Sequence, residues 1–326
     1  MTSTPDIFTI SSQKQFEKTA LKVFRFQYEN NTVYHEFCDF LKTDVQKVKS
    51  LEQIPFLPIQ FFKSHEVVSN ENPVQATFTS SGTTGMITSK HLVTDVSLYE
   101  ESYRKGFTQF YGNIEDYVIL ALLPSYMERE GSSLIYMVKD LIESSNHPES
   151  GFYLHSHDEL IAKLIALDQV GQNVILIGVT FALLDLIEKQ VFHLKHTIIM
   201  ETGGMKGRRK EMIREELHEQ LCKGFGVTAI HSEYGMTELL SQAYSLGNGV
   251  FECPSWMQIL IRDTEDALTY VDPGKTGGIN VIDLANINSC SFIATQDLGK
   301  KNANNSFEVL GRFDNSDIRG CNLMVV

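Results

Sequence analysis

The pattern of apolar positions changes twice along the 326 residues of this chain. Between residues 12 and 49 the apolar residues recur at helical spacing and are interrupted at Asn30-Asn31, which predicts two helices. The next segment, residues 54–62, carries Pro55 and Pro58 among large apolar side chains. Because proline breaks the interior of a helix, we expect this segment to be extended.

The middle of the chain alternates short apolar runs with stretches of helical spacing. Each apolar run predicts a strand and each following stretch a helix, in three pairs: 117–123 with 133–144, 174–179 with 182–191, and 197–200 with 206–222. Such an alternation is typical of a parallel sheet with crossover helices. We therefore predict an α/β fold.

The last third of the chain has a different pattern, because helical spacing fades beyond Glu238. Gly, Pro, Asn and Asp separate strand-like pieces at 256–262, 278–284 and 307–309, which predict a smaller, mostly β subdomain. We expect a single domain over 1–326 with three approximate parts: a helical and extended segment 1–75, an α/β core 76–240 with mixed or parallel sheets flanked by helices, and a mostly β subdomain 241–326.

Composition and charge narrow the class of protein. Hydrophobic residues make up 42% and charged residues 21%, as in a soluble globular protein. The net charge of −13 opposes binding to nucleic acid or to anionic lipid. Without a basic amino terminus ahead of an apolar run, or a stretch of about 20 apolar residues, we expect a cytoplasmic enzyme with no membrane span.

Cysteine and histidine spacing gives no sign of a structural metal or of disulfides. The five cysteines are widely separated and form no Cys-x-x-Cys pair, so we predict neither a zinc site nor a disulfide framework. His155 and His157 could ligate a metal, but no further ligand lies near them in the sequence, and a polar turn is the simpler interpretation.

The run Thr79-Ser80-Ser81-Gly82-Thr83-Thr84-Gly85 is the first candidate for chemistry. Its glycines allow the backbone to approach a ligand closely, and its hydroxyls and N–H groups can converge on phosphate oxygens. It lacks the spacing of a P-loop and of a dinucleotide-binding fingerprint. Taken alone, a cluster of this composition is more often an ordinary loop.

Two further clusters follow predicted strands of the α/β core. Gly203 and Gly204, in residues 202–207, mark a close backbone approach at the carboxyl end of a strand, where open α/β sheets bind ligands, or simply a tight turn. Residues 232–238 predict a turn that presents Tyr234, Thr237 and Glu238. An aromatic ring can stack on a base, a hydroxyl can bind a phosphate, and a carboxylate can hold Mg²⁺; an acidic helix N-terminus is the alternative.

Two more clusters lie in the predicted β subdomain. Asp297, at a predicted strand end, can accept hydrogen bonds from both hydroxyls of a ribose, although it could equally mark an ordinary turn. Arg312 offers a forked cation to ribose or phosphate oxygens. Cys321 follows Gly320 and has the cation Arg319 close by, which favours a thiolate.

The order of these five clusters, from Thr79 to Gly320, resembles that of the adenylate-forming superfamily. Within it the chain most resembles the LuxE-like acyl-protein synthetases, and the segments that carry this resemblance are 80–85, 201–207 and 317–321. The resemblance implies a large adenylate-forming N-terminal domain, with the core 76–240 binding the nucleotide. It also implies ATP and Mg²⁺ as cofactors and a carboxylic acid, most simply a fatty acid, as substrate.

The resemblance also implies a role for each residue that matches a motif. Ser81, Gly82, Thr83, Thr84 and Gly85 would hold the β and γ phosphates. Gly203 and Gly204 would flank the adenine, and Tyr234 would stack on it. Thr237 would touch the α-phosphate, and Glu238 would position Mg²⁺. Asp297 and Arg312 would bind the ribose.

The implied reaction is attack of the carboxylate on the α-phosphorus, which gives an acyl-adenylate and pyrophosphate. Adenylate-forming enzymes then have a mobile domain with a catalytic lysine; we expect this domain to be absent, because the sequence stops at Val326. Positive charge from Lys206, Lys90 or Arg312 would compensate in part, although Lys90 lies later after the phosphate loop than in common ligases.

In the acyl-protein synthetases a cysteine near the carboxyl terminus accepts the acyl group as a thioester, and Cys321 resembles it; a bystander thiol is the alternative. We expect transfer to Cys321 and then to a partner protein, a reductase or a carrier. Two alternatives remain: a ligase that uses coenzyme A or an amine, and a nucleotide-binding subunit without activity.

The sequence also offers candidate residues for the pocket that would bind the acid. If the fold brings them together, its walls would include Phe110, Tyr111, Leu123, Tyr126 and His231.

Overall fold

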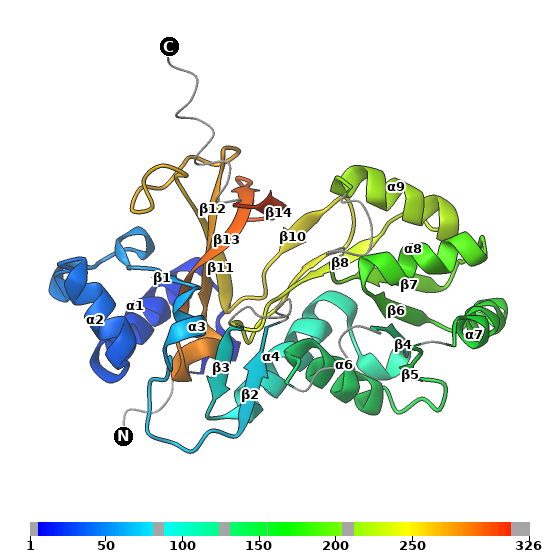
Figure 1. Ribbon diagram of the computed structural model, residues 1–326, viewed down its shortest axis with the longest axis horizontal. Helices are drawn as coiled ribbons and strands as arrows, with labels where there is room; N and C mark the ends of the chain where they lie inside the picture. Colours follow the sequence, from blue (N-terminus) through cyan, green and yellow to red (C-terminus); the bar gives the residue numbers. More distant parts are fainter. Residues whose placement is uncertain (1–5, 81–87, 124–130, 155, 204–211, 314–326) are drawn as a thin grey trace, which may run out of the picture. The chain divides into compact units, whose positions relative to one another are not determined.

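The computed structural model describes residues 6–80, 88–123, 131–154, 156–203 and 212–313. The chain divides into two compact units. We call Val74–Pro254 the central unit, and Met1–Pro73 together with Ser255–Val326 the terminal unit, because it joins the two ends of the chain. Figure 1 labels their helices and strands.

The central unit is built on a mostly parallel sheet. Its parallel strands, in the spatial order β8-β7-β6-β4-β5, are β8 (His231–Tyr234), β7 (Thr197–Glu201), β6 (Val174–Gly178), β4 (Val118–Leu122) and β5 (Gly151–Phe152). Every residue of β4 and β6 is buried, as expected for strands covered on both faces. Two antiparallel strands, β9 (Ala243–Ser245) and β10 (Val250–Glu252), extend the sheet beyond β8.

Helices cover both faces of this sheet. In Figure 1, α8 (Thr180–Lys189) and α9 (Arg214–Phe225) run along one side, and α4 (Val96–Tyr111) and α6 (Ser133–Ser144) along the other, with α7 (His157–Gln169) beside β6. The short helix η4 (Ile114–Asp116) precedes β4. A separate hairpin pairs β2 (Ala76–Thr79) with β3 (Lys90–Val93).

The terminal unit combines helices from the start of the chain with a sheet from its last third. The antiparallel strands β11 (Met257–Arg262), β12 (Thr276–Asp283), β13 (Phe292–Lys301) and β14 (Phe307–Arg312) lie in this order, and β1 (Leu57–Pro58) pairs in parallel with β13. The helices are α1 (Gln13–Asn30), α2 (Thr32–Phe40), α3 (Phe61–Ser64), η1 (Ile7–Thr9), η2 (Val45–Lys47), η3 (Leu51–Gln53) and η5 (Leu284–Asn288).

A buried glutamine links the two ends of the chain inside the terminal unit. The side-chain amide of Gln27 donates to the carbonyl oxygens of Asn286 (2.9 Å) and Ile287 (3.0 Å). Its oxygen accepts from the backbone N–H of Ser291 at 2.9 Å. Helix α1 is thereby joined to the segment that enters β13 by bonds that water cannot easily replace.

Asn31 confirms the predicted break between two helices. It ends α1, and its side chain accepts from the N–H of Tyr34 to begin α2. The first two strand–helix pairs of the core are also confirmed, as is the strand of the third. The third helix was predicted too early, since Met212 and Ile213 are not helical and α9 starts at Arg214. The pattern did not reveal α4 or α7.

One predicted strand end and one predicted turn are placed wrongly. Asp297 lies within β13, not at its end, because Lys300 and Lys301 continue the pairing with β14. Residues 231–234 are strand β8, so the turn that carries Thr237 and Glu238 begins only at Gly235. In both cases a segment rich in polar residues forms a strand. Pairing with neighbouring strands stabilises it, although its own composition does not favour a strand.

Candidate active site

The hydroxyl- and glycine-rich run connects β2 and β3. Ser81, Gly82, Thr83, Thr84 and Gly85 lie outside the described residues, but both ends of the connection are described. Ser80 and Ser89 close it: Ser80 N–H donates to the Ser89 carbonyl at 3.1 Å, and Ser89 N–H donates to Ser80 Oγ at 2.9 Å. Lys90, the first residue of β3, is exposed. The two strands therefore fix where the run begins and ends.

His91 is a residue of this region that sequence reasoning missed. It follows Lys90 in β3, is fully buried, and its Nδ1 lies 2.9 Å from the backbone oxygen of Thr237. Burial lowers the pKa of His91 to about 4, so the ring is neutral at pH 7 and Nδ1 carries the proton that it donates to the carbonyl. The histidine thereby ties the β2–β3 hairpin to the turn of Thr237 and Glu238.

At the end of β7, Gly203 adopts a conformation that favours glycine. Its φ is +73°, in the left-handed region. Its N–H donates to Glu201 Oε2 at 2.7 Å, and its carbonyl accepts from the N–H of Thr180 at 2.9 Å. The backbone is therefore held on both sides at the carboxyl edge of the sheet. Gly204 and Lys206 lie outside the described residues.

Glu201 is the centre of a buried polar network around this turn. Its Oε1 accepts from Arg214 Nη1 at 2.6 Å, and the same Arg214 nitrogen reaches Ser232 Oγ at 3.2 Å. Thr180 Oγ1 donates to Glu201 Oε2 at 3.3 Å, and His218 Nε2 lies 3.7 Å from Oε1. One carboxylate thus connects the starts of α8 and α9 with β7 and, through Arg214, with β8.

The charge of Glu201 is stabilised although the side chain is buried. Burial alone would raise the pKa of this carboxyl, but the approach of His218, the charge of Arg214 and the hydrogen bonds lower it to about 2. Glu201 stood inside one of the sequence motifs, yet its role was not predicted. A charged residue directly after an apolar strand was the signal that could have identified it.

Tyr234, Thr237 and Glu238 follow one another at the end of β8. The ring of Tyr234 is only 8% exposed and packs edge-on against Phe251, with centroids 6.0 Å apart. Thr237 is partly exposed in the turn, and Glu238 is buried. The backbone turn of Thr237 is the part of this motif that His91 fixes.

Glu233 precedes Tyr234 and has an unusual environment. Burial and the charge of Glu201 raise its pKa to about 8. Its Oε1 occupies the space that a Cβ at Gly235 would need, so a side chain at position 235 would displace this carboxyl. We find no hydrogen bond or ion pair for Glu233 within the described ranges. It therefore holds a proton at neutral pH beside the motif.

Asp297 and Arg312 lie together on neighbouring strands of the terminal unit. They are paired in register, and Arg312 Nε donates to Asp297 Oδ1 at 3.2 Å. Asp297 is 10% exposed, whereas Arg312 is 63% exposed. Opposite Ile279 of β12, residues 295–297 of β13 form a bulge, a device that commonly redirects a side chain near a functional site.

Three candidate walls of the acid pocket meet in the central unit. Tyr111 Oη lies 3.2 Å from His231 Nδ1, and Tyr244 packs against both Phe110 and Tyr111, with ring centroids 5.2 and 5.5 Å apart. Leu123 is buried at the end of β4. Tyr126 lies outside the described residues. The fold thus brings Phe110, Tyr111 and His231 together, and adds Tyr244, which the sequence did not indicate.

The thiol at Cys321 lies outside the described residues. Within the described residues the other four cysteines, Cys38, Cys222, Cys253 and Cys290, form no disulfide bond. Cys38 and Cys290 are fully buried, and burial raises the pKa of Cys38 to about 12 and that of Cys290 further. Burial makes these two thiols poor nucleophiles.

The described residues contain no group of three or more His, Cys, Asp and Glu side chains that could hold a metal ion. Proteins usually bind Mg²⁺ through one or two carboxylates together with substrate phosphates. Glu238 could supply such a carboxylate. Within the same ranges, no helix combines the length and the apolar character that crossing a membrane requires.

Solved structures of two ligases have a similar fold. ATP-bound MatB from Rhodopseudomonas palustris is similar with a TM-score of 0.55 and 17% identity, over 75% of this chain and 49% of that one. 2-Hydroxyisobutyryl-CoA ligase, in complex with 2-HIB-AMP and CoA, is similar with a TM-score of 0.68 and 13% identity, over 94% of this chain and 70% of that one. The chain therefore spans about half of MatB.

Relatives in sequence point to one family. A long-chain-fatty-acid–luciferin-component ligase from Vibrio harveyi is 24% identical over 349 residues, which cover 98% of this chain and 90% of that protein. A protein of the same name from Photorhabdus luminescens is 35% identical over 75 residues, 23% of this chain and 64% of that protein. The family model described as "Acyl-protein synthetase, LuxE" matches residues 3–105 and 145–326. Because this match covers most of the chain, the protein belongs to the LuxE acyl-protein synthetase family and has the fold of the adenylate-forming ligases.

Proposed function

We propose that this protein uses ATP to activate a carboxylic acid, most simply a long-chain fatty acid, and passes the acyl group to the thiol of Cys321. The family match over most of the chain carries this proposal. The name of the Vibrio harveyi relative supports a long-chain fatty acid as the substrate. The ATP-bound state of MatB supports ATP as the activating nucleotide.

In the first step the substrate carboxylate oxygen attacks the α-phosphorus of ATP. A new P–O bond forms, the bond to the β-phosphate oxygen breaks, and pyrophosphate leaves. The Ser81–Gly85 run would hold the β and γ phosphates with Lys90 beyond it, and Thr237 would contact the α-phosphate. The anchoring of the Thr237 backbone by His91 supports this role, since phosphoryl transfer depends on positioning.

The remaining nucleotide contacts would come from the motifs around Gly203, Tyr234 and Asp297. Gly203 and Gly204 would flank the adenine and Tyr234 would contact it, while Asp297 and Arg312 would bind the ribose hydroxyls. Bound Mg²⁺ would neutralise charge on the phosphates, and Glu238 would hold it. Lys206 would add positive charge near the reacting phosphate. The pairing of Asp297 with Arg312 in register supports their shared role.

In the second step the Cys321 thiolate attacks the acyl carbonyl of the adenylate. The C–S bond forms, the C–O bond to AMP breaks, and AMP leaves. The resulting thioester could then be delivered to a partner protein, a reductase or a carrier. The poor nucleophilicity of buried Cys38 and Cys290 supports Cys321 as the acceptor among the cysteines of this chain.

Radiolabelled fatty acid tests both steps. With ATP and Mg²⁺ we expect label on the protein that survives acid and that hydroxylamine removes, as expected of a thioester. Cys321→Ser should lose this label and still exchange pyrophosphate into ATP, whereas the control Cys253→Ser should keep both. Label that survives in Cys321→Ser would exclude the acceptor role of this thiol.

The same assay separates the two alternatives. Release of the acyl group as a coenzyme A ester or an amide, with no protein-bound label, would identify a ligase for a small acceptor. ATP binding measured by calorimetry, without pyrophosphate exchange for any acid, would identify a nucleotide-binding subunit and overturn the enzymatic proposal.

A further inference from the structure

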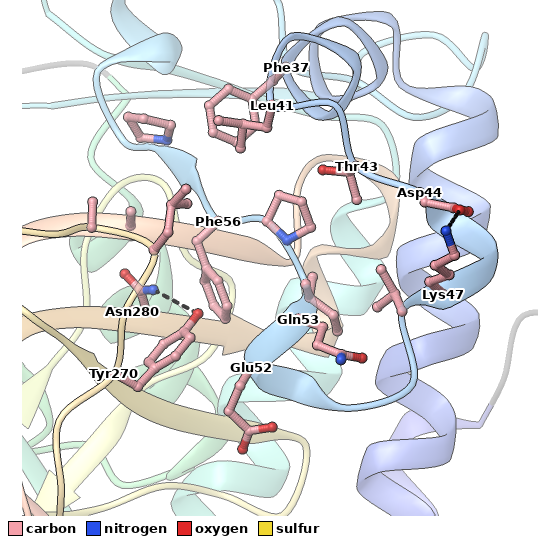
Figure 2. A pocket seen from close by; sticks show the side chains of 17 residues that line it. Phe37, Leu41, Thr43, Asp44, Lys47, Glu52, Gln53, Phe56, Tyr270 and Asn280 are labelled. Atoms are coloured by element: carbon pink, nitrogen blue, oxygen red, sulfur yellow. Dashed lines mark hydrogen bonds and ion pairs between the residues drawn. The ribbon is translucent and has the colours of Figure 1, made fainter.

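A cavity of about 590 Å³ opens within the terminal unit, between the η2–η3 segment and the sheet of β12 and β13. Figure 2 shows its lining. The volume falls within the range of about 300–1,000 Å³ that is typical of small-molecule sites. None of the residues assigned above to ATP, Mg²⁺ or acyl transfer lines it. The cavity is therefore separate from the proposed nucleotide contacts.

Carbon atoms form most of the walls. Val48, Ile54 and Phe56 are buried behind the surface. The lining also includes the apolar residues Phe37, Leu41, Pro55, Pro58, Leu268 and Ala294. Leu268 is 67% exposed at the rim, although it is a large apolar residue. Covering these surfaces with an alkyl chain would be favourable by about 25 cal/mol for each Å² removed from water.

The polar end of the cavity presents hydrogen-bond donors. Asn280 is 1% exposed, and its Oδ1 accepts from Arg262 Nη1 at 2.7 Å. The cation thereby orients the amide, so that its NH₂ group faces Tyr270, 3.5 Å from the hydroxyl oxygen. Figure 2 shows this pair beside Phe56. In the part of the chain that is described, the Tyr270 hydroxyl has no acceptor for its own hydrogen.

The charged side chains that line the cavity are net negative, and Arg262, which lies behind Asn280, is engaged by Asn280 Oδ1 and by the carbonyl oxygens of Ile279 and Thr295. Lys47 is the only cation in the described lining, and it pairs with Asp44 at 2.9 Å. Glu52 adds a second carboxylate. Burial raises the pKa of Tyr270 to about 12, so its hydroxyl remains a donor over the physiological range. Two donors inside and a net negative rim suit a neutral oxygen acceptor better than a carboxylate.

We propose that this cavity binds a neutral acyl compound, an ester, thioester or amide with an alkyl chain. Its carbonyl oxygen accepts from Tyr270 Oη and Asn280 Nδ2, and its chain lies along Phe56 and the apolar walls toward Leu268. The site is thus a second acyl site that recognises an uncharged carbonyl and not a free acid. This inference stands independently of the proposed adenylation.

Calorimetry with octanamide and the full-length protein tests the site. We expect saturable binding, and weaker binding of octanoate at pH 7. Tyr270→Phe removes one donor and should weaken octanamide binding roughly 2- to 10-fold, since a hydrogen bond contributes about 0.5–1.5 kcal/mol. The matched control, Tyr28→Phe, removes a hydroxyl of the same unit that bonds Asp39 at the surface, and should bind as the unchanged protein does.

Leu268→Ser offers a second variant at an exposed position, and it should weaken octanamide binding even if Tyr270→Phe fails to fold. Absence of saturable octanamide binding would overturn the proposal, as would tighter binding of octanoate than of octanamide. Equal octanamide binding by the unchanged protein and either correctly folded variant would also overturn it. Pyrophosphate exchange measured on the same variants reports separately on the proposed adenylation, which should be unchanged.

Discussion

The buried ring of His91 donates a hydrogen bond to the backbone oxygen of Thr237, across 2.9 Å and 146 positions of sequence. It joins β3, the strand that follows the run of residues 79–85, to the turn that follows β8. Burial keeps the ring neutral, and its single proton lies on Nδ1, where it meets the carbonyl oxygen. Two motifs far apart in the chain therefore share one anchor.

The first prediction concerns pH and His91. Its pKa is about 4 in the folded protein and about 6.5 in the unfolded chain, so the unfolded chain binds more protons between these values. The stability that comes from the neutral ring is full above pH 6.5 and is lost as the pH falls to about 4. This loss amounts to about 3 kcal/mol. Urea unfolding at a series of pH values measures it.

His91→Gln removes this titration. We expect the variant to be less stable at pH 7, and the gap to the unchanged protein to narrow as the pH falls toward 4. The exposed His65, changed to Gln, is the control and should leave the unfolding free energy at pH 7 nearly unchanged. A gap between the His91 variant and the unchanged protein that stays constant from pH 7 to pH 4 would contradict the assignment.

The second prediction concerns the network of Glu201. Glu201→Gln keeps the shape but leaves Arg214 without its anionic partner, so we expect a loss of about 3 kcal/mol in unfolding free energy at pH 7. Because the folded pKa of Glu201 is about 2, against 4.5 unfolded, its contribution is present above pH 4.5 and disappears as the pH falls toward 2. Chemical denaturation of both proteins at pH 7 and pH 3 gives the comparison.

Glu201→Gln should also raise the KM for ATP if the Gly203 turn contacts the nucleotide, because Gly203 N–H donates to this side chain. A matched change away from the network is Glu219→Gln, an exposed residue of α9. That control should alter neither quantity. An unchanged KM in a folded Glu201→Gln variant would separate the structural role of the network from nucleotide binding.

The third prediction concerns Glu233, where stability should fall as the pH rises, opposite to the effect at His91 and Glu201. Its folded pKa is about 8, so the folded protein binds more protons than the unfolded chain between pH 4.5 and 8. Stability that comes from the protonated carboxyl is therefore lost as the pH rises through this range. Glu233→Gln, which cannot ionise, should gain stability relative to the unchanged protein as the pH rises. Thermal unfolding at pH 5 and pH 8.5 measures this. The prediction would be refuted if the Tm of both proteins changed equally between the two pH values.

The fourth prediction concerns the ribose contacts. Asp297→Asn should raise the KM for ATP roughly 10- to 100-fold, since a hydrogen bond to a charged group contributes about 1.5–3 kcal/mol. The same strands provide a control in Glu308→Gln, which breaks the ion pair of Lys300 with Glu308 at 3.0 Å. Pyrophosphate exchange against ATP concentration should show the effect in the first variant only. Equal KM values would remove Asp297 from the nucleotide site.

The sequence predicted those elements whose own residues determine them. The β4 and β6 runs are continuously apolar, and Asn31 caps two helices with its own side chain. It failed at α9, whose early boundary was drawn from spacing alone, and at β13, where the strand continues past Asp297 through pairing with β14. Long-range pairing leaves little trace in local composition.

The residues of the candidate site also fall into those that local sequence identified and those that it missed. Polar residues next to glycines identified Gly203, Thr237 and Asp297 as positions worth testing, and a known family pattern assigned their roles. His91, Glu201 and Tyr244 were missed because their importance lies in contacts with distant segments. A lone histidine in a short strand carries no signal until its partner is known.

The hydrogen bonds of Gln27 determine the order in which the two units can fold during synthesis. Helix α1 is bonded to residues 286, 287 and 291, so the terminal unit cannot complete its core until the last third of the chain has left the ribosome. The central unit is contiguous in sequence and has no such delay. Because domains tend to fold as units during synthesis, the first 73 residues would wait while the 181 that follow them fold. During that interval the apolar face of α1 would be exposed, and it is there that a nascent chain of this protein would most need protection.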